Sequence, residues 1–333
     1  MNAIAASRRA LAAAAIGSTG VALTGGALAG ILLTEAKLAR RWVGVPTTVP
    51  PDDNGYYGFC PGEAISFAVL GDSSAAGLGV DRPEQTPGAR IACGLAAAAE
   101  LPVRLTNVAL VGARSADLDR QVTVALEADP DVALIMVGAN DITHRVALTA
   151  AVSYLDLAVR RLRAAGCEVI VATCPDLGTI EPIAQPLRYL ARRWSRQLAA
   201  AQTIVVVEAG GRTVSLGDLI GPEFSAAPHE MFSPDRFHPS AAGYAQAAMA
   251  VLPSVCAAMG YWPSGETAPD PSREEGLMPV AFAAVEAAER PGTEVAPAEA
   301  HERAGGLRAA AGMLRHRRRT QLEAPNAARA SAA

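Results

Sequence analysis

Lysine is almost absent from this sequence: Lys37 is the only lysine among 29 basic residues, and all the others are arginines. No glycine-rich turn is followed by a lysine, which excludes a P-loop for nucleotide phosphates. The formal net charge of −4 gives the chain no broad positive field to attract a phosphate backbone. We therefore expect no nucleic-acid partner.

Cysteine is also scarce, and no Cys-x-x-Cys pair of the kind that binds zinc occurs. The odd number of cysteines leaves at least one unpaired in a monomer. Two of them flank a predicted strand, which places them too far apart for a disulfide. These two are Cys167 and Cys174, and the others are Cys60, Cys93 and Cys256.

Two further motifs are missing. The Gly-x-Ser-x-Gly elbow of the α/β-hydrolase fold is not found. His229 and Glu230 begin like a zinc-peptidase motif, but Ser233 occupies the place of the second histidine. His229, Asp235 and His238 are the one remaining candidate for a metal site, and we expect no metal there.

The N-terminus carries a long run without charge. Residues 10–34 are rich in Ala, Leu, Gly and Val and follow the pair Arg8 and Arg9. The run is long enough to span the ~30 Å hydrocarbon core as a retained anchor, which permits membrane association. Ala27-Leu28-Ala29 equally permits a cleaved signal peptide. Both alternatives predict export, by the general or the twin-arginine route, to the cell envelope or the outside.

Changes in composition divide the chain into three parts. Residues 1–42 are the signal peptide or membrane anchor. Residues 43–262 are expected to form one domain, which is large enough for an enzyme. Residues 263–333 are rich in Ala, Pro and Glu and end in the basic run Arg315–Arg319. Such a composition predicts a largely disordered extension with at most short helices.

Short apolar runs alternate with helical stretches in the middle of the chain. This alternation predicts a doubly wound α/β fold with a parallel sheet covered on both faces. The expected strands are Ile65–Leu70, Val103–Ala109, Val132–Val137, Glu168–Thr173 and Ile204–Glu208. The expected helices are Pro87–Glu100, Ala116–Glu127, Leu148–Ala165, Pro186–Ala200 and Ser240–Ala258.

Candidate site residues follow three of the expected strands. Ser73 comes after the first strand, Gly112 after the second and Asn140 after the third. Ligands of open parallel sheets bind outside the carboxyl ends of the strands, so these residues are expected to converge. His238, three residues after Asp235, has the spacing for a base oriented by a carboxylate.

Each of these residues also has an ordinary structural explanation. Ser73 fits a turn or a helix N-cap, and Gly112 and Asn140 fit turns. Asp235 fits a cap for the helix that begins near Ser240, with His238 on the surface. Two neighbours compete for the catalytic roles: Ser74 fits a helix-start residue better than a nucleophile, and His144 lacks a preceding aspartate at the right spacing.

Four blocks in order make the chain resemble the SGNH hydrolases, also called GDSL esterases and lipases. The resemblance implies a three-layer, flavodoxin-like fold with a five-stranded parallel sheet. It implies Ser73 as nucleophile, His238 as base, Asp235 as its partner, and Ser73, Gly112 and Asn140 as oxyanion donors. It also implies hydrolysis of esters without metal or organic cofactor. The blocks are Phe67–Ser74, Asn107–Ser115, Val137–Asp141 and Asp235–Pro239.

Two alternatives to hydrolysis are open at this point. The same acyl-enzyme serves an acyltransferase when a sugar or lipid hydroxyl replaces water. A non-catalytic envelope binding protein is the second alternative. The expected partner is an ester-containing small molecule or lipid, and no particular oligomeric state is predicted. Specificity is expected to lie in the loops Cys174–Pro186 and Gly210–Phe232, where Leu219, Ile220, Phe224 and Phe232 are candidates for an acyl pocket.

Overall fold

A seven-stranded sheet forms the centre of the computed structural model, which describes Thr34 and residues 49–180, 183–216, 228–261, 280–290 and 292–297. Five strands run parallel in the order β3-β2-β4-β5-β6, and antiparallel β1 and β7 pair with the two edges. This is the flavodoxin-like order, so the predicted fold class is confirmed. The strands are β1 (Gly55–Tyr57), β2 (Ile65–Gly71), β3 (Val103–Asn107), β4 (Val132–Met136), β5 (Glu168–Ala172), β6 (Arg212–Val214) and β7 (Glu294–Val295).

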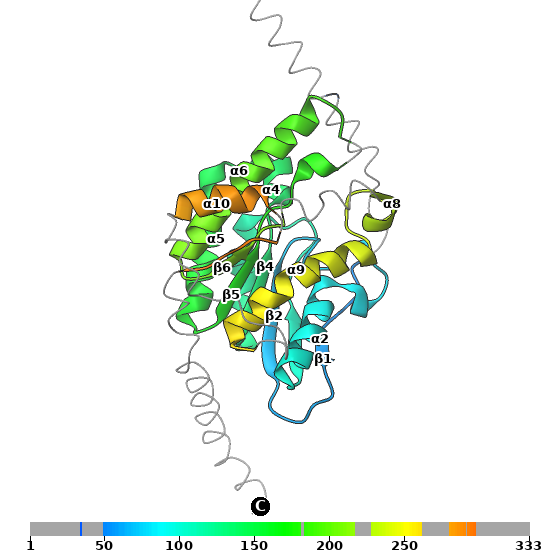
Figure 1. Cartoon of the computed structure of the whole chain (residues 1–333), viewed down its shortest axis with the longest axis vertical. Coiled ribbons are helices and arrows are strands. Elements are labelled where there is room, and N and C mark those ends of the chain that lie inside the picture. Colours follow the sequence, from blue (N-terminus) through cyan, green and yellow to red (C-terminus); the bar gives the residue numbers. More distant parts are fainter. Residues whose placement is uncertain are drawn as a thin grey trace, which may run out of the picture.

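Helices cover both faces of the sheet (Figure 1). Phe67 and Val69 of β2 pack toward α2 and α9, whereas Ala68 and Leu70 pack toward α3, α5 and α6. All seven residues of β2 are buried, as expected for a central parallel strand. The main helices are α2 (Pro87–Ala99), α3 (Leu118–Glu127), α5 (Leu148–Ala164), α6 (Leu187–Glu208) and α9 (Ala241–Met259). Short elements are η1 (Pro83–Gln85), η2 (Ser115–Asp117), α4 (Ala139–Thr143), η3 (Leu177–Thr179) and α8 (Pro228–Met231).

The fifth predicted strand, Ile204–Glu208, is wrong because these residues form the last turns of α6. Their β-branched run suits a strand, but the helix continues through them to the cap at Ala209. Gln202 binds the ends of two strands from this helix: its Oε1 accepts from the Cys174 amide at 2.8 Å, and its Nε2 donates to the Val137 carbonyl at 2.9 Å. The parallel strand at this place is the three-residue β6 instead.

Part of the expected C-terminal extension completes the domain. The helix α10 (Val280–Glu289) packs against α6, where Figure 1 draws it in orange. β7 then pairs with β6 and places Glu294 2.7 Å from the Arg212 guanidinium. The sheet therefore extends beyond the boundary expected at residue 262. The rest of the extension, and all of residues 1–42 except Thr34, lie outside the described residues.

One helix within the described part of the chain is long and apolar enough to cross a membrane, and it is α9. It packs against the sheet and α2, and its inward face belongs to the main hydrophobic core. We therefore interpret it as a core helix. The apolar run 10–34 is described only at Thr34, so its role as signal or anchor stays a prediction.

Candidate active site

Gly71 fixes the way the chain leaves β2 just before Ser73. Its φ of +137° is one that residues with a side chain rarely adopt, and an added Cβ would lie 1.9 Å from the Met136 carbonyl oxygen. Gln121 holds both backbone groups of Gly71: its Oε1 accepts from the amide at 2.7 Å and its Nε2 donates to the carbonyl at 2.9 Å. Ser73 is thus presented from a well-fixed turn.

The side chains of Ser73, His238 and Asp235 form one hydrogen-bonded chain. Ser73 Oγ lies 2.9 Å from His238 Nε2, although the two residues are 165 positions apart. His238 Nδ1 lies 2.6 Å from Asp235 Oδ2. The serine and the histidine are both buried, with 7% and 6% of their surface exposed, so their contact is shielded from competing water.

Asp235 is held ionised by several donors. Burial by itself would raise its pKa, but hydrogen bonds from His238, from the Ser233 hydroxyl and from the His238 and Phe237 amides lower this pKa well below its usual range. The amide and hydroxyl donors all reach Oδ1 at 2.7 to 2.9 Å, which leaves Oδ2 for the imidazole. A permanently charged carboxylate orients the ring and favours its protonated form.

The helix that follows this loop does not use Asp235 as its cap. Ser240 is the N-cap of α9, and its Oγ accepts from the amides of Ala242 and Gly243. Asp235 is therefore free for His238. The loop also packs closely on the turn after Ser73, since a Cβ on Gly79 would lie 2.6 Å from the Pro239 carbonyl oxygen.

Ser73, Gly112 and Asn140 provide donors near the end of β2. Among the described residues, the backbone amides of Ser73 and Gly112 have no hydrogen-bond acceptor. The Asn140 side-chain amide donates to the Ala113 carbonyl at 3.0 Å, which ties it to the Gly112 loop and leaves its second N–H. Asp141 also joins α4 to the segment after Gly112 by accepting from the Ser115 amide and hydroxyl.

Other candidates fall outside this arrangement. His144 is exposed, and its Nδ1 lies 2.9 Å from the Asn140 carbonyl oxygen. The Ser74 amide donates to Asp72 Oδ1 at 2.9 Å. Within the described residues, no three His, Cys, Asp or Glu side chains are placed to hold a metal ion together. This includes His229, Asp235 and His238, the one candidate group from the sequence.

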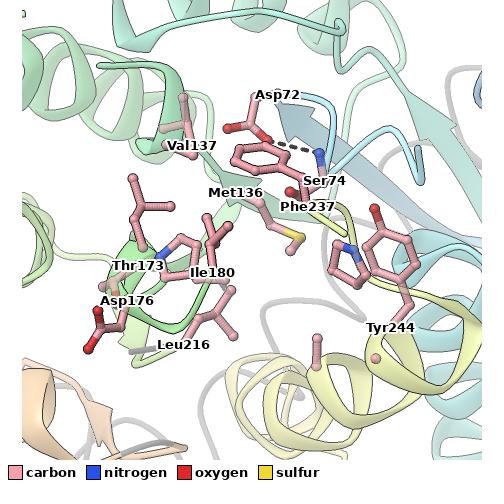
Figure 2. A pocket seen from close by; sticks show the side chains of 17 residues that line it. Asp72, Ser74, Met136, Val137, Thr173, Asp176, Ile180, Leu216, Phe237 and Tyr244 are labelled. Atoms are coloured by element: carbon pink, nitrogen blue, oxygen red, sulfur yellow. Dashed lines mark hydrogen bonds between the residues drawn. The ribbon is translucent and has the colours of Figure 1, made fainter. Parts of the chain in front are cut away.

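A pocket lies beside the Ser73–His238 pair, and Figure 2 shows the side chains that line it. Its walls are mostly apolar, and the main contributors are Met136, Val137, Ile180, Leu216, Phe237 and Tyr244. The first predicted specificity loop contributes Ile180, and the second contributes Leu216. Of the named candidates in the second loop, Leu219, Ile220 and Phe224 lie outside the described residues, and Phe232 is buried.

Burial strongly shifts the pKa of an acidic side chain at this pocket. Asp72 is fully buried, and desolvation raises its pKa to about 6, although its hydrogen bond from the Ser74 amide acts in the opposite direction. The sequence singled out neither Asp72 nor Gln121 as part of the site. Gln121 carries no motif, and only its contact with Gly71 shows its role.

Such a hydrogen-bonded serine, histidine and aspartate, with free amides nearby, is the arrangement of serine hydrolases. The GDSL-like lipase/acylhydrolase family model matches residues 69–246, just over half of the chain. A GDSL-like esterase of Mycobacterium tuberculosis is 42% identical over 248 residues, which cover 71% of this chain and 78% of that protein. The chain therefore belongs to the GDSL-like lipase/acylhydrolase family and is an SGNH-type ester hydrolase. The resemblance seen in the four blocks is confirmed.

Solved structures of lower sequence identity also match the chain. An acetylxylan esterase of Geobacillus stearothermophilus is 23% identical and has a TM-score of 0.46, with 58% of this chain and 95% of that chain covered. An enzyme from the metagenome of Lake Arreo in Spain is 19% identical and has a TM-score of 0.47, with 60% and 96% covered.

Proposed function

We propose that this protein hydrolyses carboxylic esters through an acyl-enzyme on Ser73. His238 is the general base, Asp235 orients it, and the amides of Ser73 and Gly112 with the Asn140 side chain hold the oxyanion. The observation that carries the proposal is the unbroken chain from Asp235 Oδ2 through both nitrogens of His238 to Ser73 Oγ, with contacts of 2.6 and 2.9 Å.

The first half of the reaction transfers the acyl group to the enzyme. Ser73 Oγ attacks the ester carbonyl carbon while His238 Nε2 takes the hydroxyl proton. The carbonyl oxygen becomes an oxyanion that accepts hydrogen bonds from the Ser73 and Gly112 amides and from Asn140. His238 then returns the proton to the leaving alcohol oxygen as the carbon–oxygen bond breaks. Water repeats these steps on the acyl-enzyme and releases the acid.

Asp235 acts on this reaction through the histidine. Its Oδ2 accepts from Nδ1, so the Nδ1 proton stays in place and Nε2 keeps its lone pair toward Ser73. When Nε2 takes the proton, the ring becomes positive beside a carboxylate that has remained ionised. The lowered pKa of Asp235 supports this role because the carboxylate does not take up the proton itself.

Ser73→Ala tests the assignment, with p-nitrophenyl acetate as substrate. Removing the nucleophile should reduce kcat by at least about 10³-fold, whereas Ser153→Ala, a matched change on the exposed face of α5, should leave it unchanged. Ser73-dependent labelling by a fluorophosphonate, located by mass spectrometry, separates Ser73 from Ser74. Undiminished acyl release by Ser73→Ala would refute the proposal.

We also propose that the enzyme acts outside the cytoplasm, because the uncharged run 10–34 has the length and position of an export signal or anchor. Cell fractionation with an antibody to the catalytic domain tests this. Recovery of all the protein in the cytoplasmic fraction would contradict it.

A further inference from the structure

The pocket next to the proposed catalytic pair is built from elements that the catalytic steps do not use. Met136 and Val137 come from the end of β4, Ile180 follows η3, and Leu216 follows β6. Ala247 of α9 lies on the same wall, one turn along the helix from Gly243. Figure 2 shows Ile180 and Leu216 on one side of the pocket and Tyr244 on the other.

The pocket lies next to the catalytic pair, because the chain neighbours of Ser73 and His238 form part of its wall. Asp72 and Ser74, which flank Ser73, line it, and so do Phe237 and Pro239, which flank His238. Ser73 and His238 themselves do not line the pocket, so a group bound to Ser73 Oγ would enter it from the edge formed by these neighbours.

The order of the strands separates the pocket from part of the oxyanion site. Gly112 follows β3 on one side of β2, whereas most of the pocket lies at the ends of β4, β5 and β6 on the other side. The carbonyl oxygen of a bound ester points to its hydrogen-bond donors. The donors lie on both sides of β2, since Asn140 follows β4. Of the two substituents on the carbonyl carbon, the one directed away from Gly112 extends toward β4, β5 and β6.

The polar groups on the pocket wall are mostly engaged elsewhere. Asp72 Oδ1 accepts from the Ser74 amide. Asp176 Oδ2 contacts the guanidinium groups of Arg192 at 3.2 Å and Arg196 at 3.1 Å, and its Oδ1 accepts from the Gly178 amide. The Thr173 hydroxyl is the exception, because it has no hydrogen-bond partner among the described residues. The rest of the surface left for a ligand is mostly apolar, which suits a hydrocarbon chain better than a sugar.

We propose that this pocket binds the acyl chain of the substrate, and that the enzyme prefers esters of medium-chain fatty acids over acetate esters. The proposal rests on the proposed function, because it takes the acyl group to be attached to Ser73. Burying each additional methylene should raise kcat/KM by up to about fourfold, the equivalent of ~0.8 kcal/mol, until the pocket is full.

Chain-length preference in p-nitrophenyl esters from acetate to octanoate tests this. We expect kcat/KM of the wild-type enzyme to rise from acetate to hexanoate. Ala247→Leu places three more carbons in the pocket, so the hexanoate-to-acetate ratio of kcat/KM should fall at least about tenfold. Ala242→Leu is the matched control because Ala242 lies on the exposed face of the same helix, and it should leave the ratio unchanged.

A second variant works in the opposite direction. Ile180→Ala enlarges the pocket, so the optimum should move to a longer chain. A wild-type series that is flat or falls from acetate to hexanoate would overturn the proposal. An unchanged hexanoate-to-acetate ratio in Ala247→Leu would also overturn it, provided that this variant unfolds at the same temperature as the wild type. That result is expected if the acyl chain lies instead on Leu110 and Val111, which are exposed beside Gly112.

Different results would refute the esterase function and the acyl-chain pocket. If Ser73→Ala keeps its acyl release, the proposed function fails. If Ser73→Ala is inactive but neither pocket variant changes the chain-length ratio, the esterase assignment stands and only the acyl-chain pocket is refuted.

Discussion

Replacing Asp235 with asparagine exchanges one carboxylate oxygen for an NH₂ group at the position where His238 needs an acceptor. Asparagine can keep the oxygen that accepts from Ser233, Phe237 and His238 at 2.7 to 2.9 Å. The amide nitrogen then occupies the Oδ2 position, 2.6 Å from His238 Nδ1. Because that nitrogen donates, Nδ1 must become the acceptor, and the ring proton moves to Nε2.

This change of tautomer disables the base without dismantling the loop. With a proton on Nε2, His238 donates to Ser73 Oγ and cannot remove the serine proton. The carboxylate charge that stabilises the protonated ring is lost as well. Together these effects should lower kcat about 10³- to 10⁴-fold, or about 4 to 5 kcal/mol, while KM changes little because Asp235 does not contact the substrate.

Steady-state hydrolysis of p-nitrophenyl acetate near pH 8 measures the effect, and thermal unfolding reports on the fold. Asp156→Asn is the matched control: it removes a carboxylate that pairs with the exposed Arg160 on α5 and has no part in the proposed site, and it should keep wild-type kcat. A folded Asp235→Asn protein with kcat within tenfold of wild type would refute the orientation of His238 by Asp235.

Two further predictions concern stability. Burial raises the pKa of Asp72 from 3.8 to about 6, so its contribution to stability is intact below pH 3.8 and is lost as the pH rises through 6; the difference corresponds to about 3 kcal/mol. Asp72→Asn should therefore increase the free energy of unfolding more at pH 8 than at pH 4. Urea unfolding of both proteins at the two pH values measures this difference, and a larger increase at pH 4 would contradict the reasoning. Gly71→Ala should destabilise the protein by several kcal/mol, since the new Cβ would lie 1.9 Å from the Met136 carbonyl oxygen. Gly260→Ala has a positive φ but no atom within 4 Å of the new Cβ, so it should cost only about 1 to 2 kcal/mol in the same assay, and equal effects at the two glycines would contradict the clash.

The sequence predicted four of the five parallel strands because each is a short apolar run between turn residues. It missed β6 for a physical reason: three residues carry little pattern, and the nearby Ile204–Val207 run has the side chains that strands prefer. Those residues are helical because tertiary contacts decide, as with Gln202 bonded to the ends of β4 and β5.

For the site, the motif residues were found because each of them lies in a short recognisable block. Their placement at one edge of the sheet could be expected from topology, since Ser73, Gly112 and Asn140 all follow parallel strands. The supporting groups were not predictable in this way. Gln121 lies in an ordinary helix, and the pocket combines residues from β4, β5, η3, α9 and the segment after β6 that share no motif. Sequence order indicates which strand a residue follows, but not which side chains meet between elements.

Because β7 lies late in the sequence, the β6 edge of the sheet can be closed only after most of the chain has been made. While the polypeptide is being made or threaded across a membrane, β6 is an unpaired edge until Glu294 and Val295 have emerged, some 80 residues later. The serine, histidine and aspartate are all synthesised before that point. The hydrolytic machinery can therefore assemble while the sheet still has one open side, which β7 can close only once it has been made.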